Sequence, residues 1–375
     1  MKKIIQFNKP YISKNSKIFI NKVFENKNFT DGVFQKKCEK FIKSKTNSKF
    51  VSLTHSGTSA LEIAMVLLNI KKGDEVIIPS FTFTSTANCV VMSGAKPVFV
   101  DIDCNLNIDA EKIEKKITKK TKAIIIVHYG GFSCEMDKIL RLKKKYNLFL
   151  IEDAAHAFLA KYKKKYIGTF GEIGMYSFHE TKNFTSGQGG ALLINDNKYI
   201  NRAKIILDKG TDRSFYYNKK KYYSWKGFGS EYRAPELSAA LLFSQFKEYK
   251  VIQKRRKKIW KYYYEKLSLI KSKKFRILNY KDTKKICSYH SFPIIFKSIK
   301  KRNRFIEFMK KKGIFCYFHY FPLHMSKFGK KFSKEKLLNT EKTWKGLVRI
   351  PIYPDLKNFD LKHIARSIQI FIKLL

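Results

Sequence analysis

The chain has 375 residues, of which 44% are hydrophobic, so it can bury a large core and is long enough for two lobes. It contains no uncharged apolar run of about 18 residues, so no membrane-spanning helix is expected. The basic N-terminal segment lacks the long apolar stretch of a signal peptide, which predicts a cytoplasmic protein. The six cysteines form no C-x-x-C pair and no zinc-like cluster with histidine, so free thiols and no metal site are predicted.

The formal net charge of +48 is high enough to attract nucleic acid or another polyanion. The surplus of lysine and arginine is spread along the whole chain, which is also rich in asparagine, isoleucine, phenylalanine and tyrosine. This distribution favours a general compositional bias over a selected polyanion partner, and no nucleic-acid-binding motif stands out. Either origin of the charge predicts attraction of anionic small molecules that weakens as salt rises.

Helical and strand-like segments alternate from about residue 52 to residue 194. Residues 58–70 have the apolar spacing of a helix, and short β-rich runs lie within residues 74–80, 95–103 and 122–131. An amphipathic helix at 136–147 precedes a strand that ends in Glu152 and Asp153, and a further strand-like run at 175–178 precedes Lys182. Strands separated by helices predict a mostly parallel sheet, which binds ligands at the carboxyl ends of its strands.

A long helical stretch over residues 235–267 is predicted to lead into a second lobe. That lobe contains a strand-like run at 287–296, a helix at 303–314, the segment 316–324 and a final helix, which is an α+β pattern. We therefore expect a large domain over residues 1–245 and a small C-terminal domain over residues 246–375.

Small and polar residues close several of the predicted strands. Gly57, Thr58 and Ser59 precede a helix, where backbone N–H groups and two hydroxyls can bind an anion. Phe83 follows the next strand and can stack on a planar ring, and Asp153 ends a later strand, where its carboxylate can pair with a protonated ring nitrogen. Each feature also has a simpler interpretation, which is helix N-capping for the polar residues and core packing for Phe83.

Lys182 lies in the segment YSFHETKNFTSGQGGALL, between a strand and a pair of glycines. A lysine forms a Schiff base when burial or nearby cations lower the pKa of its amine. Ser177 can add a hydroxyl to the anion site, and the glycines allow close backbone approach. An anion site, an aromatic ring, a strand-end carboxylate and this lysine, in that order, fit one ligand, pyridoxal 5′-phosphate (PLP).

The motifs resemble those of the DegT–StrS type sugar-nucleotide aminotransferases. The likeness covers nearly the whole chain and runs through SGTSALEIA, GDEVIIPSFTFTSTAN, LFLIEDAAHA, MYSFHETKNFTSGQGGALL and RIPIYPDL. It implies an α/β fold of the aspartate aminotransferase-like class (fold type I), with a mostly parallel seven-stranded sheet in the large domain and a small α+β C-terminal domain. It also implies a homodimer that builds each active site across two subunits.

The resemblance implies roles for individual residues. Lys182 would carry PLP as a Schiff base and move protons, and Asp153 would pair with the pyridine nitrogen. Phe83 would stack on the ring, and His156 would lie near its hydroxyl side. The residues implied to bind the phosphate are Gly57, Thr58, Ser59 and Ser177.

Within the family the chain is most similar to the group that forms dTDP-4-amino-4,6-dideoxygalactose. This likeness implies amino transfer from glutamate to carbon 4 of a dTDP-4-keto-6-deoxyhexose, for a surface glycan. Candidate substrate residues are Lys209 and Arg213 for the anionic nucleotide, and His319, Tyr320 and His324 for the sugar. Lys209 and Arg213 fit an exposed basic loop at least as well.

Two positions depart from the pattern of the family. The resemblance also leaves two rival functions to consider. Gln188 stands where relatives often carry glutamate, and the contact near Glu231 that relatives take from a neighbouring subunit is unassigned. Related sugar dehydratases replace the anchoring lysine by histidine, so Lys182 argues against that activity, and His179 lies too early in the motif to be the substitute. The presence of both Asp153 and Lys182 disfavours a regulatory protein that kept the fold without its chemistry.

Overall fold

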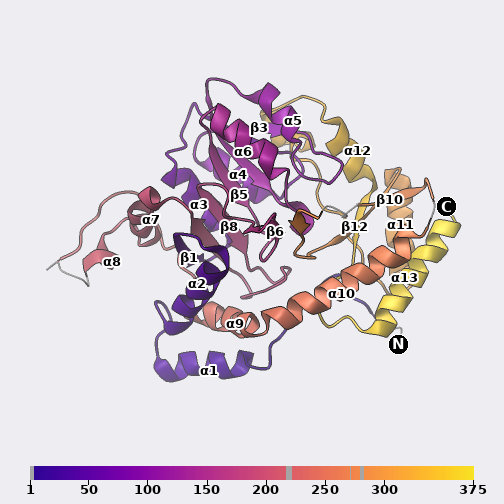
Figure 1. Cartoon of the computed structure of the whole chain (residues 1–375), viewed down its shortest axis with the longest axis horizontal. Coiled ribbons are helices and arrows are strands. Elements are labelled where there is room, and N and C mark those ends of the chain that lie inside the picture. Colours follow the sequence, from indigo (N-terminus) through magenta and orange to yellow (C-terminus); the bar gives the residue numbers. More distant parts are fainter. Residues whose placement is uncertain (1–3, 217–221, 271, 279–282) are drawn as a thin grey trace.

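The computed structural model describes residues 4–216, 222–270, 272–278 and 283–375 (Figure 1). A seven-stranded sheet forms the centre of the larger lobe, in the order β1-β9-β8-β5-β4-β2-β3. Its strands are β1 (Phe50–Thr54), β2 (Glu75–Pro79), β3 (Lys96–Val100), β4 (Thr121–Val127), β5 (Phe149–Asp153), β8 (Ile173–Ser177) and β9 (Gly190–Ile194). β9 is antiparallel to both neighbours and the other pairs are parallel, which confirms the predicted mostly parallel sheet.

Helices cover both faces of this sheet. One face carries α2 (Val33–Thr46), α6 (Met136–Lys145) and α9 (Glu236–Lys247), and the other carries α3 (Gly57–Leu67), α4 (Thr84–Met92) and α7 (Ile200–Leu207). In β4, Ile124 and Ile126 join the first core, while Ala123 and Ile125 join the second. Because side chains alternate along a strand, a sheet buried on both faces requires continuous apolar strands.

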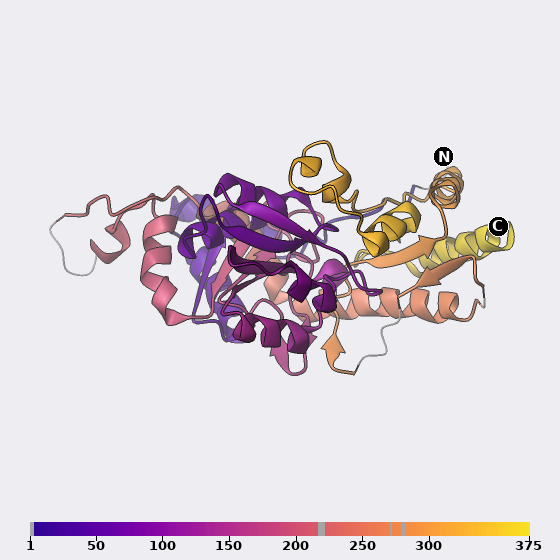
Figure 2. The ribbon, with the colours of Figure 1, turned by 90° about the horizontal axis from the view of Figure 1, so that it is seen from above.

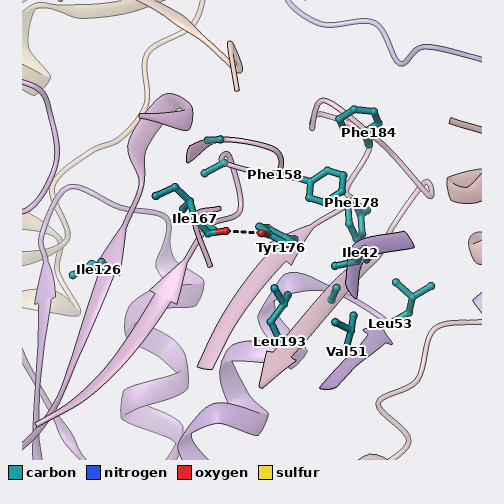
Figure 3. Close-up of a cluster of buried hydrophobic side chains, with 14 of the residues drawn as sticks. Ile42, Val51, Leu53, Ile126, Phe158, Ile167, Tyr176, Phe178, Phe184 and Leu193 are labelled. Atoms are coloured by element: carbon teal, nitrogen blue, oxygen red, sulfur yellow. Dashed lines mark hydrogen bonds between the residues drawn. The ribbon is translucent and has the colours of Figure 1, made fainter. Parts of the chain in front are cut away.

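The first of these cores anchors the loop that contains Lys182. Phe178 and Phe184, which flank Lys182 in sequence, are both 1% exposed and pack with Phe158, as Figure 3 shows. The buried Tyr176 hydroxyl donates a hydrogen bond to the Ile167 carbonyl at 2.5 Å. The aromatic core therefore fixes both ends of the Lys182 loop.

The smaller lobe has an apolar core of its own. An antiparallel sheet of β10 (Phe275–Ile277), β12 (Phe292–Phe296) and β13 (Leu347–Ile350) packs with α10 (Tyr249–Ser268), α11 (Ile299–Lys311) and α13 (Asn358–Lys373). α10 joins the lobes, because Ile252 near its start belongs to a core of the larger lobe, whereas Trp260 and Tyr263 belong to the small core. The exact division at residues 245 and 246 stays a prediction.

Further elements connect and cover the two lobes. A second three-stranded antiparallel sheet pairs segments far apart in sequence, in the order β11-β6-β7. The remaining helices and short strands are α1 (Ser16–Asn26), α5 (Ala110–Ile113), α8 (Arg213–Tyr216), α12 (Leu338–Gly346), β6 (Lys161–Tyr162), β7 (Lys165–Tyr166) and β11 (Lys285–Ile286). Within the described part of the chain, no helix combines the length and apolar character needed to cross a bilayer.

The long helical stretch predicted over residues 235–267 is helical in the structure, but it is divided in two. The chain forms two helices, α9 and α10, which meet at Glu248, where φ is −110° and ψ is 17°. The Glu248 carboxylate accepts hydrogen bonds from the hydroxyls of Tyr11 and Ser13 in the N-terminal segment. The break allows α9 to stay on the large sheet while α10 extends towards the smaller lobe (Figure 1).

Glu152 holds the carboxyl end of β5 in place. Its carboxylate is fully buried and accepts hydrogen bonds from the backbone N–H groups of Gly168 and Gly171, both at 2.8 Å, and of Phe170. The His128 ring lies 3.2 Å from the same carboxylate. One side chain therefore satisfies a buried turn and fixes the strand end that carries Asp153.

We predict that Glu152→Ala lowers the free energy of unfolding by roughly 3 kcal/mol or more, because it leaves several buried N–H donors without an acceptor. Urea unfolding followed by circular dichroism measures the change. Glu265→Ala, at an exposed position of α10, is the control and should change stability little. A loss of under about 1 kcal/mol in the Glu152 variant would contradict this account.

Candidate active site

A cavity of about 600 Å³ opens at the carboxyl ends of β4, β5 and β8. Val127, Asp153 and Ser177 line it from these strand ends, and Thr82, Phe83 and Ser85 line it from the connection between β2 and α4. The N-terminal segment and the smaller lobe supply Phe7, Asn8, His290, Tyr317, His319, Tyr320, Arg349 and Ile352. The cavity lies where a mostly parallel sheet is expected to bind its ligand.

The Lys182 loop is held by backbone and side-chain hydrogen bonds. Phe178 donates its N–H to the Gly189 carbonyl at 2.7 Å, and the Ser186 N–H donates to the Phe178 carbonyl at 2.9 Å. From α9, the Gln245 amide accepts the Thr185 N–H at 3.0 Å and donates to the Thr185 carbonyl at 3.0 Å. These contacts hold the Lys182 side chain in the wall of the cavity.

The Lys182 amine lines the cavity and has an altered pKa. Burial lowers its pKa to about 8; the Asp153 carboxylate acts in the opposite direction, and the positive charge of Arg349 adds to the lowering. An amine with this pKa is partly neutral near physiological pH and can attack a carbonyl carbon. The structure therefore gives Lys182 the property that a Schiff-base lysine needs.

Asp153 supplies the negative charge of the cavity. It is buried at the end of β5, where its carboxylate accepts a hydrogen bond from the Thr86 hydroxyl at 2.8 Å and from the Ala155 N–H at 3.2 Å. Burial raises the pKa of the Asp153 carboxyl, and Thr86, Ala155 and Lys182 partly offset that rise. Residues 154–160 form turns, so the alternative that Asp153 caps a helix at this point is wrong.

The start of α3 forms an anion cradle beside the end of β8. Gly57 and Thr58 line the cavity together with Ser177, and the Thr58 hydroxyl lies 2.7 Å from that of Ser85. A Cβ on Gly57 would lie 3.2 Å from the Ser177 Cβ and 2.9 Å from the Met175 Cε, so glycine keeps the cradle open. Ser59 does not line the cavity; its N–H and hydroxyl bond instead to the Ser56 hydroxyl, each at 3.0 Å.

His156 presents a neutral imidazole to the cavity. Its Nδ1 accepts the Gly130 N–H at 3.3 Å, which leaves Nε2 as the protonated nitrogen. The ring stacks on that of His290 with centroids 4.1 Å apart. Burial, together with the charges of Lys182 and Arg349, holds the pKa of His156 well below its usual range. The ring can therefore donate a hydrogen bond without carrying a charge.

The remaining predicted residues divide into two groups. Phe83, His319 and Tyr320 line the cavity, and Phe83 is 58% exposed, which is more than core packing would leave. His324 is buried outside the cavity, with Nδ1 2.6 Å from the Ser80 hydroxyl. Lys209 pairs with Glu231, and Arg213 pairs with Asp208 at 2.9 Å. The described chain thus does not bring His324, Lys209, Arg213 or Ser59 into the cavity.

The structure adds four residues that the sequence interpretation did not assign. Thr86 binds Asp153, His290 stacks on His156, Phe7 lines the cavity from the N-terminal segment, and Arg349 lines it from β13. Thr86 lies three residues after Phe83, about one helical turn. This spacing in the sequence could have indicated that Thr86 lies near the same site. Nothing near Phe7, His290 or Arg349 in sequence indicates that these distant segments meet.

A lysine with a lowered pKa, a buried carboxylate and an anion cradle at the strand ends of this fold fit a PLP-dependent enzyme. The chain belongs to the DegT/DnrJ/EryC1/StrS aminotransferase family, whose model matches residues 10–369. This confirms the resemblance read from the sequence and the predicted fold class. The protein is a sugar aminotransferase of this family, and the cofactor of the family is PLP.

Individual relatives span almost the full chain. The spore coat polysaccharide biosynthesis protein SpsC of Bacillus subtilis is 30% identical and covers 98% of this chain and 97% of its own. GDP-perosamine synthase of Escherichia coli O157:H7 is 29% identical, with coverage of 98% and 99%. The structure of Helicobacter pylori PseC, an aminotransferase of pseudoaminic acid biosynthesis, superimposes with a TM-score of 0.92 at 26% identity and covers all of both chains.

The residues that line the cavity fit PLP. Asp153 is a buried carboxylate with two hydrogen bonds, and it can still accept the proton of a ring nitrogen. Gly57, Thr58, Ser85 and Ser177 face one another around a space that suits a phosphate. Lys182 has the lowered pKa that a covalent link requires.

We predict that the rate at which apoprotein captures added PLP rises about tenfold per pH unit well below pH 8 and levels off above it. Only the neutral Lys182 amine attacks the aldehyde of PLP, and below its pKa most of the amine is protonated. Stopped-flow absorbance of the cofactor band at a series of pH values measures the rate.

A matched variant tests the cause. Asp153→Asn removes the carboxylate that raises the Lys182 pKa, so the plateau should begin at lower pH. A capture rate that keeps rising towards about pH 10 would show an ordinary lysine and contradict the prediction.

Proposed function

We propose that this protein transfers the amino group of glutamate to carbon 4 of a dTDP-4-keto-6-deoxyhexose and forms a 4-amino-4,6-dideoxy sugar nucleotide for a surface glycan. The observation that carries the proposal is the Lys182 amine, with its lowered pKa, in one cavity with the Asp153 carboxylate. A lysine that exchanges between neutral and protonated forms near physiological pH serves both as the attachment point and as the proton carrier.

Two residues perform the central chemistry. PLP, when bound, supplies an electron sink and carries the amino group between the two half-reactions. Lys182 would accept the proton from the α-carbon of glutamate, and it would supply a proton in the reverse direction when the keto sugar accepts the amine. Asp153 keeps the ring nitrogen protonated, and its hydrogen bonds from Thr86 and Ala155 fix the carboxylate in position.

Other residues of the cavity bind and orient. Gly57, Thr58 and Ser177 hold the phosphate at the start of α3, with Ser85 fixing the Thr58 hydroxyl. Phe83 would cover one face of the PLP ring, and the neutral His156 could donate a hydrogen bond from Nε2 to the ring hydroxyl. His319 and Tyr320 line the cavity from the smaller lobe, where they could contact the sugar.

The sugar-nucleotide class rests on the family, and the finer assignment rests on sequence likeness. The name of one relative, GDP-perosamine synthase, gives GDP as the nucleotide of its sugar, so the nucleotide differs from the dTDP proposed for this chain. The motifs SFHETKN, FHYFPLH and VHYGGFSCEMD favour a dTDP-sugar for this chain. A related aminotransferase that acts on another keto sugar nucleotide is the alternative.

We predict that Lys182→Ala lowers amino transfer from glutamate to a dTDP-4-keto-6-deoxyhexose by at least about 100-fold, because the acid–base group is lost. The visible absorption band of bound PLP should also disappear. Lys164→Ala, at an exposed position, is the matched control and should keep both properties. Normal transfer by the Lys182 variant would contradict the central assignment.

The same assay, run with dTDP-, GDP- and UDP-linked 4-keto sugars, separates the nucleotide assignment from the chemistry. The highest kcat/KM is expected for the dTDP sugar. A preference for GDP or UDP would leave the aminotransferase activity intact and replace only the substrate. Exchange of glutamate for glutamine or alanine identifies the donor in the same way.

The homodimer is the second part of the proposal. In Figure 2, α8 and its neighbouring segments extend away from the larger lobe. Tyr222, Trp225 and Phe228, which follow α8 in sequence, are 77%, 81% and 65% exposed. Large aromatic side chains at this exposure are typical of protein–protein contacts. A second copy of the chain would cover them and bring the segment near Glu231 towards its active site.

We predict that the protein sediments at twice its chain mass of 44.1 kDa, and that Trp225→Glu shifts it towards monomer and lowers activity in parallel. A charge placed in an apolar interface opposes association. Analytical ultracentrifugation measures the mass. Phe359→Glu, at an equally exposed aromatic of α13, is the control and should remain dimeric. A monomeric but active wild-type protein would disprove the shared site.

A further inference from the structure

The outward face of α10 carries a row of lysines. The inward face packs into the cores of the two lobes, as Ile252, Ile259 and Tyr263 show. Five exposed lysines occupy the opposite face, and we call them the lysine stripe: Lys250, Lys254, Lys257, Lys258 and Lys261. With about 3.6 residues and about 5.4 Å per helical turn, the stripe covers an arc of about 100° and a length of about 16 Å.

The charge of the lysine stripe is not neutralised by the protein. Within the part of the chain that the structure describes, none of its five lysines forms an ion pair with a carboxylate. Glu265 is the one acid of α10, and it lies one turn beyond the last lysine of the stripe. Arg255, on the flank of the stripe, pairs with Asp355 at 3.0 Å. The stripe is therefore a ridge of free positive charge.

The lysines of α6 are arranged differently. Three of them bind glutamates, at 2.6, 2.5 and 2.7 Å respectively: Lys138 with Glu111, Lys143 with Glu172 and Lys145 with Glu114. A lysine-rich composition by itself thus does not leave every helix of this protein without acidic partners. The absence of such partners along the lysine stripe is a feature of α10.

Exposed apolar side chains border the lysine stripe. Val251 and Leu269 are 43% and 78% exposed. They are separated by 18 positions, about five helical turns, so both lie on the side of α10 that also carries Lys258. A basic helix face next to exposed apolar side chains suits the boundary between lipid headgroups and acyl chains. Nucleic acid is more often bound by arginines and exposed aromatic rings, and the stripe contains neither.

The shape of this surface also favours a flat partner. α10 runs as one helix from the larger lobe to the smaller one (Figure 1), so its outward face is a convex ridge. A small anion is usually bound in a concave site. A ridge of lysines can instead contact many anionic groups at once when these groups lie in a plane.

We propose that the lysine stripe docks the enzyme on a membrane surface rich in anionic phospholipid headgroups. The contact is peripheral, with the ammonium groups of the lysines against the headgroup phosphates. Each lysine close to such a surface strengthens binding by roughly fivefold, and salt weakens the attraction. The proposal goes beyond the proposed function and does not depend on which keto sugar the enzyme uses.

The test measures co-sedimentation of the full-length, PLP-loaded protein with vesicles of equal parts phosphatidylglycerol and phosphatidylcholine. In the stripe variant, all five lysines of the stripe are changed to glutamine. Its affinity for these vesicles should fall at least about 100-fold, because five contributions of roughly fivefold each are lost. Vesicles of phosphatidylcholine alone should bind neither protein.

A second variant provides the matched control. It loses the same five charges from exposed lysines on separate parts of the chain, by the substitutions Lys22→Gln, Lys49→Gln, Lys72→Gln, Lys122→Gln and Lys342→Gln. Its affinity for the anionic vesicles should change less than about threefold, since scattered charges lie beyond the screening length from a docked surface. None of the ten substituted lysines lines the active-site cavity, so both variants should keep the activity and the sedimentation mass of the wild type.

Several outcomes would overturn the proposal. An equal loss of vesicle binding in both variants would show that total charge, and not the stripe, drives the binding. Absence of wild-type binding to the anionic vesicles would reject the docking role directly. Tighter wild-type binding to polyuridylate than to vesicles, lost in the stripe variant, would assign the surface to nucleic acid. A changed sedimentation mass of the stripe variant would place α10 in a contact between subunits. All these measurements can be made whether or not the protein transfers amino groups.

Discussion

Two consecutive carboxylates at the end of β5 face opposite sides of the large sheet, and the active site depends on this alternation. Glu152 points to the face covered by α2, α6 and α9, where it accepts the N–H groups of the 168–171 turn. Asp153 points to the other face, where Thr86 of α4 donates to it. Glu152 is structural because three backbone N–H groups and the His128 ring surround its carboxylate. Asp153 can still accept a hydrogen bond from a ligand, because Thr86 and Ala155 use only part of its acceptor capacity. A shift of register by one residue would exchange the two roles.

The cavity shows how a very basic chain arranges its charge where chemistry occurs. Burial, to which the charge of Arg349 adds, keeps the Lys182 amine partly neutral, and the Asp153 carboxylate acts in the opposite direction. The three imidazoles of His156, His290 and His319 all have lowered pKa values, that of His319 to about 3, because burial and the neighbouring cations disfavour protonation. The ligands of the site are anionic, and the protein contributes positive charge and neutral donors to receive them. The net charge of +48 sits mostly elsewhere, on the surface lysines.

Most of the fold and the centre of the site could be predicted from sequence, because both depend on local patterns. The β-rich runs that end in Asp153 and Ser177 mark strand ends, and strand ends of a parallel sheet meet at one edge. The small lobe's contribution could not be predicted, since Phe7, His290 and Arg349 reach the cavity through contacts between distant segments. Lys209 and Arg213 lie outside the cavity, and each is paired with an acid, Glu231 and Asp208 respectively. The contacts of Glu248 with Tyr11 and Ser13 could not be predicted either, because these residues lie at the other end of the chain.

Gln245 joins three parts of the chain at one point, and this has a consequence for folding. Its amide binds both backbone groups of Thr185 and also donates to the Tyr11 carbonyl at 3.1 Å. The loop that contains Lys182 is thus completed by hydrogen bonds between residues 60 and 234 positions apart in sequence. Contacts of such separation are entropically costly and form late, after the local helices and strands. The loop that contains Lys182 reaches its final conformation only when these long-range contacts have formed. Capture of the cofactor is therefore expected to report the end of folding rather than an early step in it.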